Sequence, residues 1–296
     1  MRIKSRLVSC LAISFVLLIG TFAIAFGQNE AKNPAVGPDR SQKGIEISIL
    51  VDNYSCNEGL NNFCKEGLDP AWGLSCLVRG TEKTILFDTG PRNGPLLENM
   101  RKMNIKPEEV DVVVLSHIHH DHTGGLQRFL EENHDVIIYL PKSFPPDFKE
   151  GARASGAKVV EVTGPLKICA LVYSTGELEG MEMEQSLVVR TDMGGIVIAG
   201  CSHPGIVEIV SMAKKVLKGD LVLAMGGFHL LSVFPGEGPS SQEIEKIVSD
   251  LKVHGVRYVG STHCSGDEAR GVFKNAYQKH YLDLGAGKVI MAKDLR

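Results

Sequence analysis

Residues 112–125 read VVVLSHIHHDHTGG, an apolar run followed by a cluster of histidines. Within six residues, directly after an apolar run, stand His117, His119, His120, Asp121 and His122. A strand that extends into this segment would send His117 and His119 to the same side, so that both imidazoles could hold one cation. Asp121 and His122 could then hold a second cation or orient a water molecule. The alternative is a loop that only faces solvent, but such a loop gives no reason for four histidines and an aspartate in six residues. The sequence therefore predicts a metal site here.

Apolar runs bounded by turn residues alternate with helical patterns on both sides of this segment. Strands are predicted at 45–51, 74–78, 84–87, 110–115, 136–140, 168–173, 186–189, 196–199, 221–224 and 257–259. Helices are predicted at 96–103, 125–132, 206–217, 242–252 and 268–278. Strands that alternate with helices indicate an α/β protein.

A weak internal repeat divides the chain into two similar halves. SCLVR at 75–79 and ILFDTG at 85–90 align with SLVVR at 186–190 and IVIAGC at 196–201. In each copy a predicted hairpin is followed by a helix, a buried strand and a loop that carries histidine. Two such halves predict two sheets packed face to face with helices outside, whose strand-end loops meet along one edge. Chance similarity is the alternative, because few positions are identical.

Composition narrows the class of protein and of partner. The 296 residues are 43% hydrophobic and 23% charged, which indicates a globular chain of one large domain or two small ones. The 32 basic residues are outnumbered by 35 acidic residues, giving a net charge of −3. This balance argues against nucleic acid as the partner. We expect a small-molecule substrate, and the sequence leaves the oligomeric state open.

The first 25 residues predict a signal peptide. Basic residues at 2–6 precede an apolar stretch at 7–22, and the small residues Ala23 and Ala25 follow it. Cleavage after Ala25 would export the protein to the periplasm or out of the cell, with a flexible leader at 26–43 and the folded domain at 44–296. The alternative is an uncleaved membrane anchor, since residues 7–26 could just span a bilayer.

Export affects the interpretation of the cysteines. An oxidising compartment permits disulfides, and Cys56 and Cys64 are the natural pair. Two free thiols in a loop are the alternative for this pair. Cys264 could pair with Cys201 or stay free.

LSHIHHDHTGGL at 115–126, preceded by ILFDTG at 85–90, resembles the metallo-β-lactamase-fold hydrolases. The resemblance extends from Ile45 to the end of the chain and implies a four-layer αββα sandwich. It also implies one or two metal ions, usually zinc, at the shared edge of the two sheets, and imidazole-rich ligation favours zinc as well.

Further segments are similar to one branch of that superfamily. They include VDN at 51–53, IAGCSHPGI at 198–206, GGFHL at 226–230 and STHCSG at 261–266. The branch is named after 7,8-dihydropterin-6-ylmethyl-4-(β-D-ribofuranosyl)aminobenzene 5′-phosphate synthase. Its name implies a transferase.

The resemblance implies a metal-ligand set. His117 and His119 would bind the first metal, whereas Asp121, His122 and His263 would bind the second. Asp88, in the FDTG turn, would orient ligands rather than coordinate.

This sequence lacks the bridging aspartate that the superfamily usually carries. Candidates to fill the gap are His203, Cys201 and Glu184, in that order. His203 ranks first because it follows a strand end and because an imidazole, unlike a thiol, does not oxidise outside the cell.

The metal site predicts a reaction class. A bound metal lowers the pKa of its water to about 7 and polarises a carbonyl or phosphoryl oxygen. Asp121 would hold or accept the proton, and His229, in the second-half counterpart of the metal loop, would line the substrate site. We therefore predict an exported, metal-dependent hydrolase of an ester, amide or phosphoester. The alternatives are a transferase that uses the same cations on a phosphorylated substrate and a non-catalytic protein that binds a metal or ligand.

Overall fold

The computed structural model describes residues 44–56, 63–231 and 238–296. The predicted signal peptide at 1–25 and the leader at 26–43 lie outside the described residues, so export stays a prediction. Within the described ranges, no helix is both long enough and apolar enough to cross a lipid bilayer. Cys56 and Cys64 form a disulfide, which is one of the two alternatives that the sequence left open.

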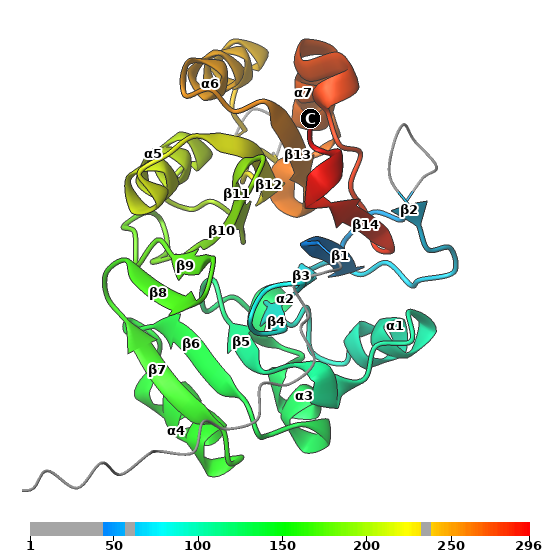
Figure 1. Cartoon of the computed structure of the whole chain (residues 1–296), viewed down its shortest axis with the longest axis vertical. Coiled ribbons are helices and arrows are strands. Elements are labelled where there is room, and N and C mark those ends of the chain that lie inside the picture. The colour runs from blue at the N-terminus through cyan, green and yellow to red at the C-terminus, as the bar shows by residue number, and fades with distance from the viewer. Residues whose placement is uncertain (1–43, 57–62, 232–237) are drawn as a thin grey trace, which may run out of the picture. The chain divides into compact units, whose positions relative to one another are not determined.

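The larger sheet has the strand order β2-β14-β1-β3-β4-β5-β6-β7 (Figure 1). Its strands are β1 (Glu46–Val51), β2 (Phe63–Cys64), β3 (Ser75–Arg79), β4 (Ile85–Phe87), β5 (Val112–Val114), β6 (Ile137–Pro141), β7 (Lys158–Val162) and β14 (Lys288–Met291). The sequence patterns did not predict β2, β7 or β14. β2 is very short, and in β7 the residues alternate only weakly between buried and exposed.

The smaller sheet has the order β13-β12-β11-β10-β9-β8. Its strands are β8 (Leu166–Cys169), β9 (Val172–Ser174), β10 (Leu187–Thr191), β11 (Gly194–Ala199), β12 (Leu221–Gly227) and β13 (Tyr258–Thr262). The prediction of a single strand over 168–173 is wrong, because the chain reverses there and β8 pairs antiparallel with β9. The turn includes Leu171 at φ 68°, and the apolar run holds no glycine, proline or asparagine to signal it.

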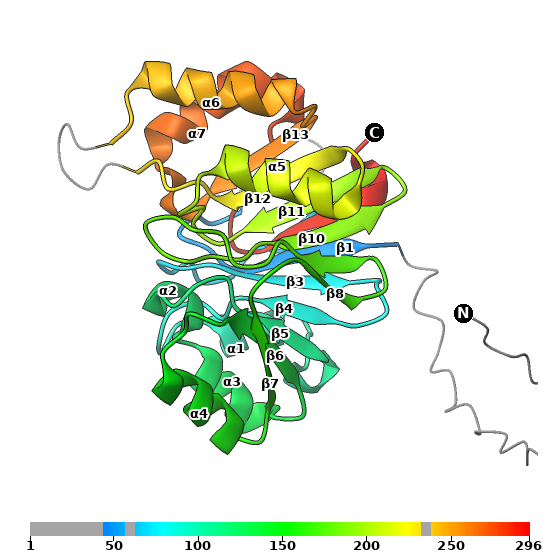
Figure 2. The same cartoon turned by 90° about the vertical axis from the view of Figure 1, so that its left-hand side faces the viewer.

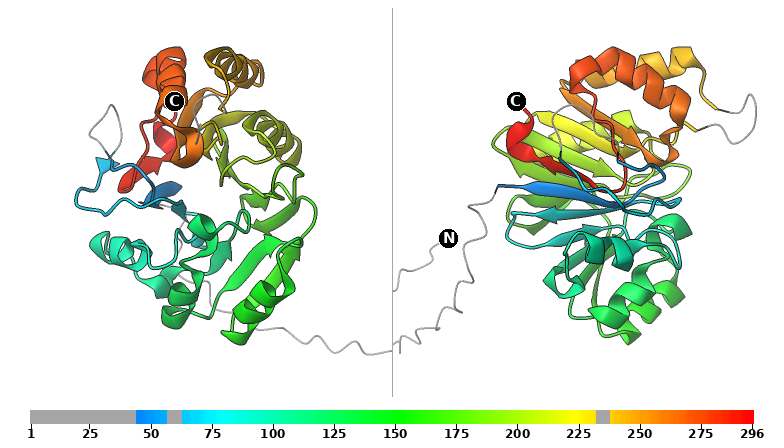
Figure 3. Two further views of the ribbon diagram at one scale, coloured as in Figure 1. Left: turned by 180° about the vertical axis from the view of Figure 1, so that it is seen from behind. Right: turned by 90° about the vertical axis from the view of Figure 1, so that its right-hand side faces the viewer.

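Helices cover the outer face of each sheet (Figure 2). They are α1 (Leu96–Lys102), α3 (Leu126–Glu132), α4 (Pro146–Ala154), α5 (Ile206–Leu217), α6 (Ser241–Val253) and α7 (Asp267–Tyr277). The short helix α2 (His120–Thr123) belongs to the segment between β5 and α3. The helices α1, α3 and α4 pack on the larger sheet, and α5, α6 and α7 pack on the smaller one. Figure 3 shows the same two helix layers from two further sides. The predicted αββα sandwich is therefore confirmed.

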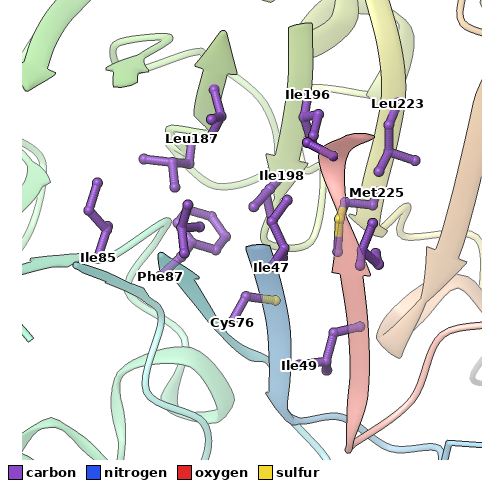
Figure 4. Close-up of a cluster of buried hydrophobic side chains, with 14 of the residues drawn as sticks. Ile47, Ile49, Cys76, Ile85, Phe87, Leu187, Ile196, Ile198, Leu223 and Met225 are labelled. Carbon is purple, nitrogen blue, oxygen red and sulfur yellow. The ribbon is translucent and has the colours of Figure 1, made fainter. Parts of the chain in front are cut away.

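The core between the two sheets is built from alternate residues of the inner strands. Ile47 and Phe87 of the larger sheet meet Leu187 and Ile198 of the smaller one, and all four are fully buried (Figure 4). Burial of such side chains stabilises the fold by roughly 1.5–3 kcal/mol each. This contact fixes the two sheets against each other and brings their edges together.

Both halves of the chain repeat one arrangement of strands. The hairpin β3–β4 leads through α1 to β5, which lies parallel to β4. The hairpin β10–β11 leads through α5 to β12, parallel to β11, and β13 continues in the same direction. The carboxyl ends of parallel strands lie at the same edge of their sheet, so the loops that follow them come together.

Candidate metal centre

Loops at the carboxyl ends of parallel strands carry the predicted site residues. The loop after β5 contains His117 and His119, and the loop after β11 contains His203. The loops after β12 and β13 contain His229 and His263. Because the sheets pack face to face, these four loops meet at one edge of the sandwich.

The first group of possible metal ligands consists of His117, His119 and His203. One ring nitrogen of each lies within 4.8 Å of the others. His117 Nε2 is 3.1 Å from His119 Nδ1, and the His203 ring is 4.7 and 4.9 Å from these two rings, centroid to centroid. The strand β5 ends at Val114, so the loop, and not an extension of the strand, directs His117 and His119 to the same place.

The second group consists of Asp121, His122 and His263. Asp121 Oδ2 lies 3.3 Å from His263 Nε2 and 3.7 Å from His122 Nε2. The Nε2 atoms of the two histidines are 3.1 Å apart. Two segments far apart in the sequence thus offer three donor atoms to one position.

Cys201 lies between the two groups. Its Sγ is 3.2 Å from His122 Nε2, and together with His117 and His122 it forms a further set of three close donor atoms. Cys201 and Cys264 are both buried and free, so the disulfide that the sequence allowed between them is not formed. The thiol of Cys201 therefore lies close to donor atoms of both groups.

Glu184, the third candidate ligand, belongs to none of these groups within the described part of the chain. Its carboxylate instead accepts hydrogen bonds from the four consecutive backbone N–H groups of Gly200, Cys201, Ser202 and His203, at 2.9 to 3.1 Å. Burial raises the pKa of Glu184 to about 7, against the lowering effect of these N–H donors. Glu184 thus holds the backbone of the turn that carries His203, which favours His203 and Cys201 over Glu184 among the three candidate ligands.

Other polar groups contact the Nδ1 atoms of the site histidines and so fix the orientation of their rings. Asp88 Oδ2 lies 2.7 Å from His122 Nδ1, and Asn53 Oδ1 lies 2.9 Å from His263 Nδ1. Such contacts favour a proton on Nδ1 and leave Nε2 free to bind a metal. In the sequence, Asn53 was noted only as part of the VDN segment at 51–53, and no role in the site was predicted for it.

Ser116 supports the first group in the same way. Its hydroxyl donates to Asp88 Oδ2 and lies 2.8 Å from His117 Nδ1. A Cβ atom at Gly200 would lie 2.2 Å from this hydroxyl, so only glycine allows the turn after β11 to approach β5 so closely. The sequence did not single out Ser116 either, although it directly precedes His117.

The electrostatics of the site suit cation binding. Burial and the neighbouring histidines hold the pKa of His117 well below its ordinary value and lower that of His203 to about 3. Burial would raise the pKa of Asp121, but the hydrogen bond from His263 and the charges of His122 and His263 hold it well below its usual range. Neutral imidazoles and an ionised carboxylate are the protonation states that metals require.

His122 differs from the other histidines of the site. Burial would lower its pKa, but the Asp88 carboxylate raises that pKa to about 9. Because His122 is fully buried between Asp88 and Asp121, a positive charge is stabilised at this point.

His203 provides the test of whether a metal fits. Its side chain is almost fully buried, and neither Nδ1 nor Nε2 has a hydrogen-bond partner among the described residues. An unpaired buried polar atom costs about 1–3 kcal/mol, so such atoms normally have a partner. A cation held by His117, His119 and His203 would give His203 that partner. The residues present therefore fit a metal ion.

The remaining histidines lie at different distances from the centre. His229 is exposed, and its ring is 4.4 Å from that of His203, so it lies at the opening of the site. The hydrogen bond with Cys264 raises the pKa of His229. His120 is exposed and belongs to none of the close donor groups in the described part of the chain.

Comparison with known proteins identifies similar chains. The model of the metallo-beta-lactamase superfamily matches residues 73–282. A curated relative from Methanocaldococcus jannaschii, 7,8-dihydropterin-6-methyl-4-(beta-D-ribofuranosyl)-aminobenzene-5'-phosphate synthase, is 30% identical over 83% of this chain and 96% of its own length.

Solved structures show the same fold. The crystal structure of Tm1679, a metal-dependent hydrolase of the beta-lactamase superfamily, is 28% identical, with a TM-score of 0.67 over 84% of this chain and 99% of that chain. YhfI from Bacillus subtilis, a metallo-beta-lactamase fold protein, is 15% identical, with a TM-score of 0.59 over 83% and 98% of the two chains. At that identity the second likeness concerns the fold alone.

Proposed function

The chain belongs to the metallo-beta-lactamase superfamily, and on that premise we propose that it is a metal-dependent hydrolase of a small-molecule phosphoester. One observation carries the proposal: both ring nitrogens of His203 are buried without a hydrogen-bond partner in the described part of the chain, beside the nitrogens of His117 and His119. The second donor group, with Asp121, His122 and His263, adjoins the first through Cys201. Zinc, as one or two ions, is the metal we propose for these donors, because imidazole ligands suit it.

The residues of the site have separate tasks in this proposal. When bound, the metal supplies a hydroxide at neutral pH and a Lewis acid for a phosphoryl oxygen. Asp121 Oδ2 lies 3.3 Å from His263 Nε2, and its carboxylate would hold the proton of the attacking water in place. His229 stands at the opening of the site, where its ring can donate a hydrogen bond to the substrate.

The test combines metal analysis with a hydrolysis assay on the purified protein. We expect bound zinc by elemental analysis and hydrolysis of bis(4-nitrophenyl) phosphate that stops when a chelator is added. His117→Ala and His119→Ala should each remove most of the first metal and the activity. His120→Ala is the matched control and should change neither, because this histidine is exposed and outside the donor groups.

Two results would contradict the proposal. Unchanged metal stoichiometry in both His117→Ala and His119→Ala would show that these residues are not ligands. Bound metal without turnover of any phosphoester, lactone or β-lactam would favour a non-catalytic metal-binding protein.

A transferase is the second candidate. The observation that favours it is the 30% identity, over most of both chains, to a relative named as a synthase of a dihydropterin ribofuranosylaminobenzene phosphate. The test supplies the two parts of the product in that name: a 7,8-dihydropterin with a diphosphate leaving group on its 6-methyl carbon, and a 4-(β-D-ribofuranosyl)aminobenzene 5′-phosphate. Mass spectrometry then looks for the joined product and for released diphosphate. Formation of both would replace the hydrolase proposal.

Localisation and partners belong to the same proposal. We propose export with cleavage after Ala25, supported by the basic, apolar and small-residue order of residues 2–25. Intact Met1 on protein from the extracytoplasmic fraction would rule out cleavage and favour the membrane anchor. The net charge of −3 supports a small-molecule substrate rather than nucleic acid.

A further inference from the structure

Trp72 is the one tryptophan of the sequence, and it lies beside the candidate metal centre. Its indole ring is 5.4 Å from the imidazole of His263, centroid to centroid. Yet 54% of the Trp72 surface is exposed. A large aromatic side chain that stays half exposed next to a reactive site leaves a flat apolar face available to a ligand.

The backbone around Trp72 is fixed on both sides. The N–H of Ala71 donates to the backbone oxygen of Asp52, and the N–H of Gly73 donates to Asn53 Oδ1. The same Asn53 oxygen lies 2.9 Å from His263 Nδ1, so one amide positions both the tryptophan loop and a possible metal ligand. Trp72 is therefore held at a set distance from the centre.

Gly73 shows how closely this loop approaches the metal loop. It has φ 149°, and a Cβ atom there would lie 2.4 Å from the backbone oxygen of Asp121. Directly after it, the N–H of Leu74 donates to that same oxygen at 3.2 Å. Trp72 therefore directly precedes two residues, Gly73 and Leu74, whose backbone contacts the backbone oxygen of Asp121.

A second apolar side chain stands near the other end of the site. Met181 is 75% exposed, and its neighbour Gly180 is so close to His203 that a Cβ atom would lie 2.4 Å from the His203 backbone oxygen. On the other side, Glu182 lies 3.9 Å from His119 Nε2. The chain on both sides of Met181 therefore approaches the first donor group.

We propose that Trp72 is a stacking platform and that the substrate is a small anion whose charged group goes to the metal centre while its flat aromatic ring lies on the indole. This inference deepens the proposed function and rests on it for the metal-bound end of the ligand. Stacking of an aromatic ring contributes about 0.5–1.5 kcal/mol beyond area burial, which corresponds to a factor of roughly 2–12 in affinity.

The test compares two probes of the same charge that differ in planarity. At a pH above the second pKa of both acids, phenylphosphonate and cyclohexylphosphonate are dianions, and neither is a phosphoester that the protein could hydrolyse. Isothermal titration calorimetry on the full metal-loaded protein should give phenylphosphonate the higher affinity, by a factor of about 2–12. Trp72→Leu should abolish this preference and leave cyclohexylphosphonate binding unchanged, whereas Trp72→Phe should keep most of it.

Controls separate stacking from a structural role of Trp72. Leu171→Ala also removes an exposed apolar side chain, but from the β8–β9 turn, and should leave both affinities unchanged. Metal content should stay the same in all three variants. Loss of metal in Trp72→Leu, with equal weakening of both probes, would make Trp72 a support for His263 and overturn the proposal.

Other outcomes distinguish this inference from the proposed function. If the wild type binds metal and hydrolyses phosphoesters but shows no preference for phenylphosphonate, the stacking platform is wrong and the hydrolase stands. If no phosphoester is hydrolysed but the preference persists and depends on Trp72, the platform stands and the hydrolase is wrong. If both affinities are unchanged in Trp72→Leu, the indole does not contact the probes and the stacking platform is refuted. The exposed indole would then be available to a partner protein.

Discussion

Replacing Glu184 with glutamine should release the turn that carries His203. In the native protein the carboxylate accepts four backbone N–H groups, from Gly200 to His203, and is fully buried. Glutamine has the same shape but offers only one oxygen. Its NH₂ group would face backbone N–H donors, and two donors cannot form a hydrogen bond with each other.

The magnitude follows from the contacts that change. At least one buried N–H group, that of His203 if the amide oxygen takes the place of Oε1, loses its acceptor, which costs about 1–3 kcal/mol. At a pH well above 7, where Glu184 is ionised, the other three bonds change from charge-assisted to neutral acceptors, and neutral hydrogen bonds are about half as strong. We therefore expect the free energy of unfolding to fall by about 3 kcal/mol.

Urea denaturation, followed by circular dichroism in the presence of a chelator, measures this difference without any contribution from bound metal. Glu179→Gln is the matched control, because the same substitution at this exposed carboxylate should change the unfolding free energy by less than about 0.5 kcal/mol. Elemental analysis of the folded Glu184→Gln protein should show partial loss of the metal at the first group. An unfolding midpoint and a metal content equal to those of the wild type would refute the reasoning.

Further predictions concern the ligands, their supports and the disulfide. His203→Ala should lower metal occupancy and abolish turnover while Cys201→Ser is milder; the opposite order in elemental analysis would make the site one with a thiolate ligand. Asp88→Asn should weaken metal binding about 10–100-fold, because Asp88 accepts the hydrogen bond that orients the His122 ring and makes it a better metal ligand. Competition with a chromophoric chelator measures the metal affinity, and an unchanged value would contradict this prediction. Replacing Cys56 and Cys64 with serine should lower the unfolding free energy by about 2.5 kcal/mol, and an unchanged urea midpoint would contradict this.

The local sequence pattern determined the elements whose signal repeats within a few residues. The helix α5 begins and ends at the predicted residues 206 and 217, because apolar residues at spacings of three and four mark its buried face. Hairpins β3–β4 and β10–β11 follow from the internal repeat. The histidine cluster at 117–122 predicted a metal site, since the residue types and their spacing carry the chemistry themselves.

Which distant residues contact one another depends on how the strands and helices pack. Glu184 looked like a replacement ligand, but the packing of β10 beside β11 turns its carboxylate toward the backbone of 200–203. Asn53 and His263 are 210 positions apart, and no pattern in either segment predicts the hydrogen bond between their side chains. Hydrophobic periodicity in a sequence predicts which side chains are buried, but not which residues they contact. Those contacts are fixed when the two sheets pack together, and so the arrangement of the metal centre came from the packing.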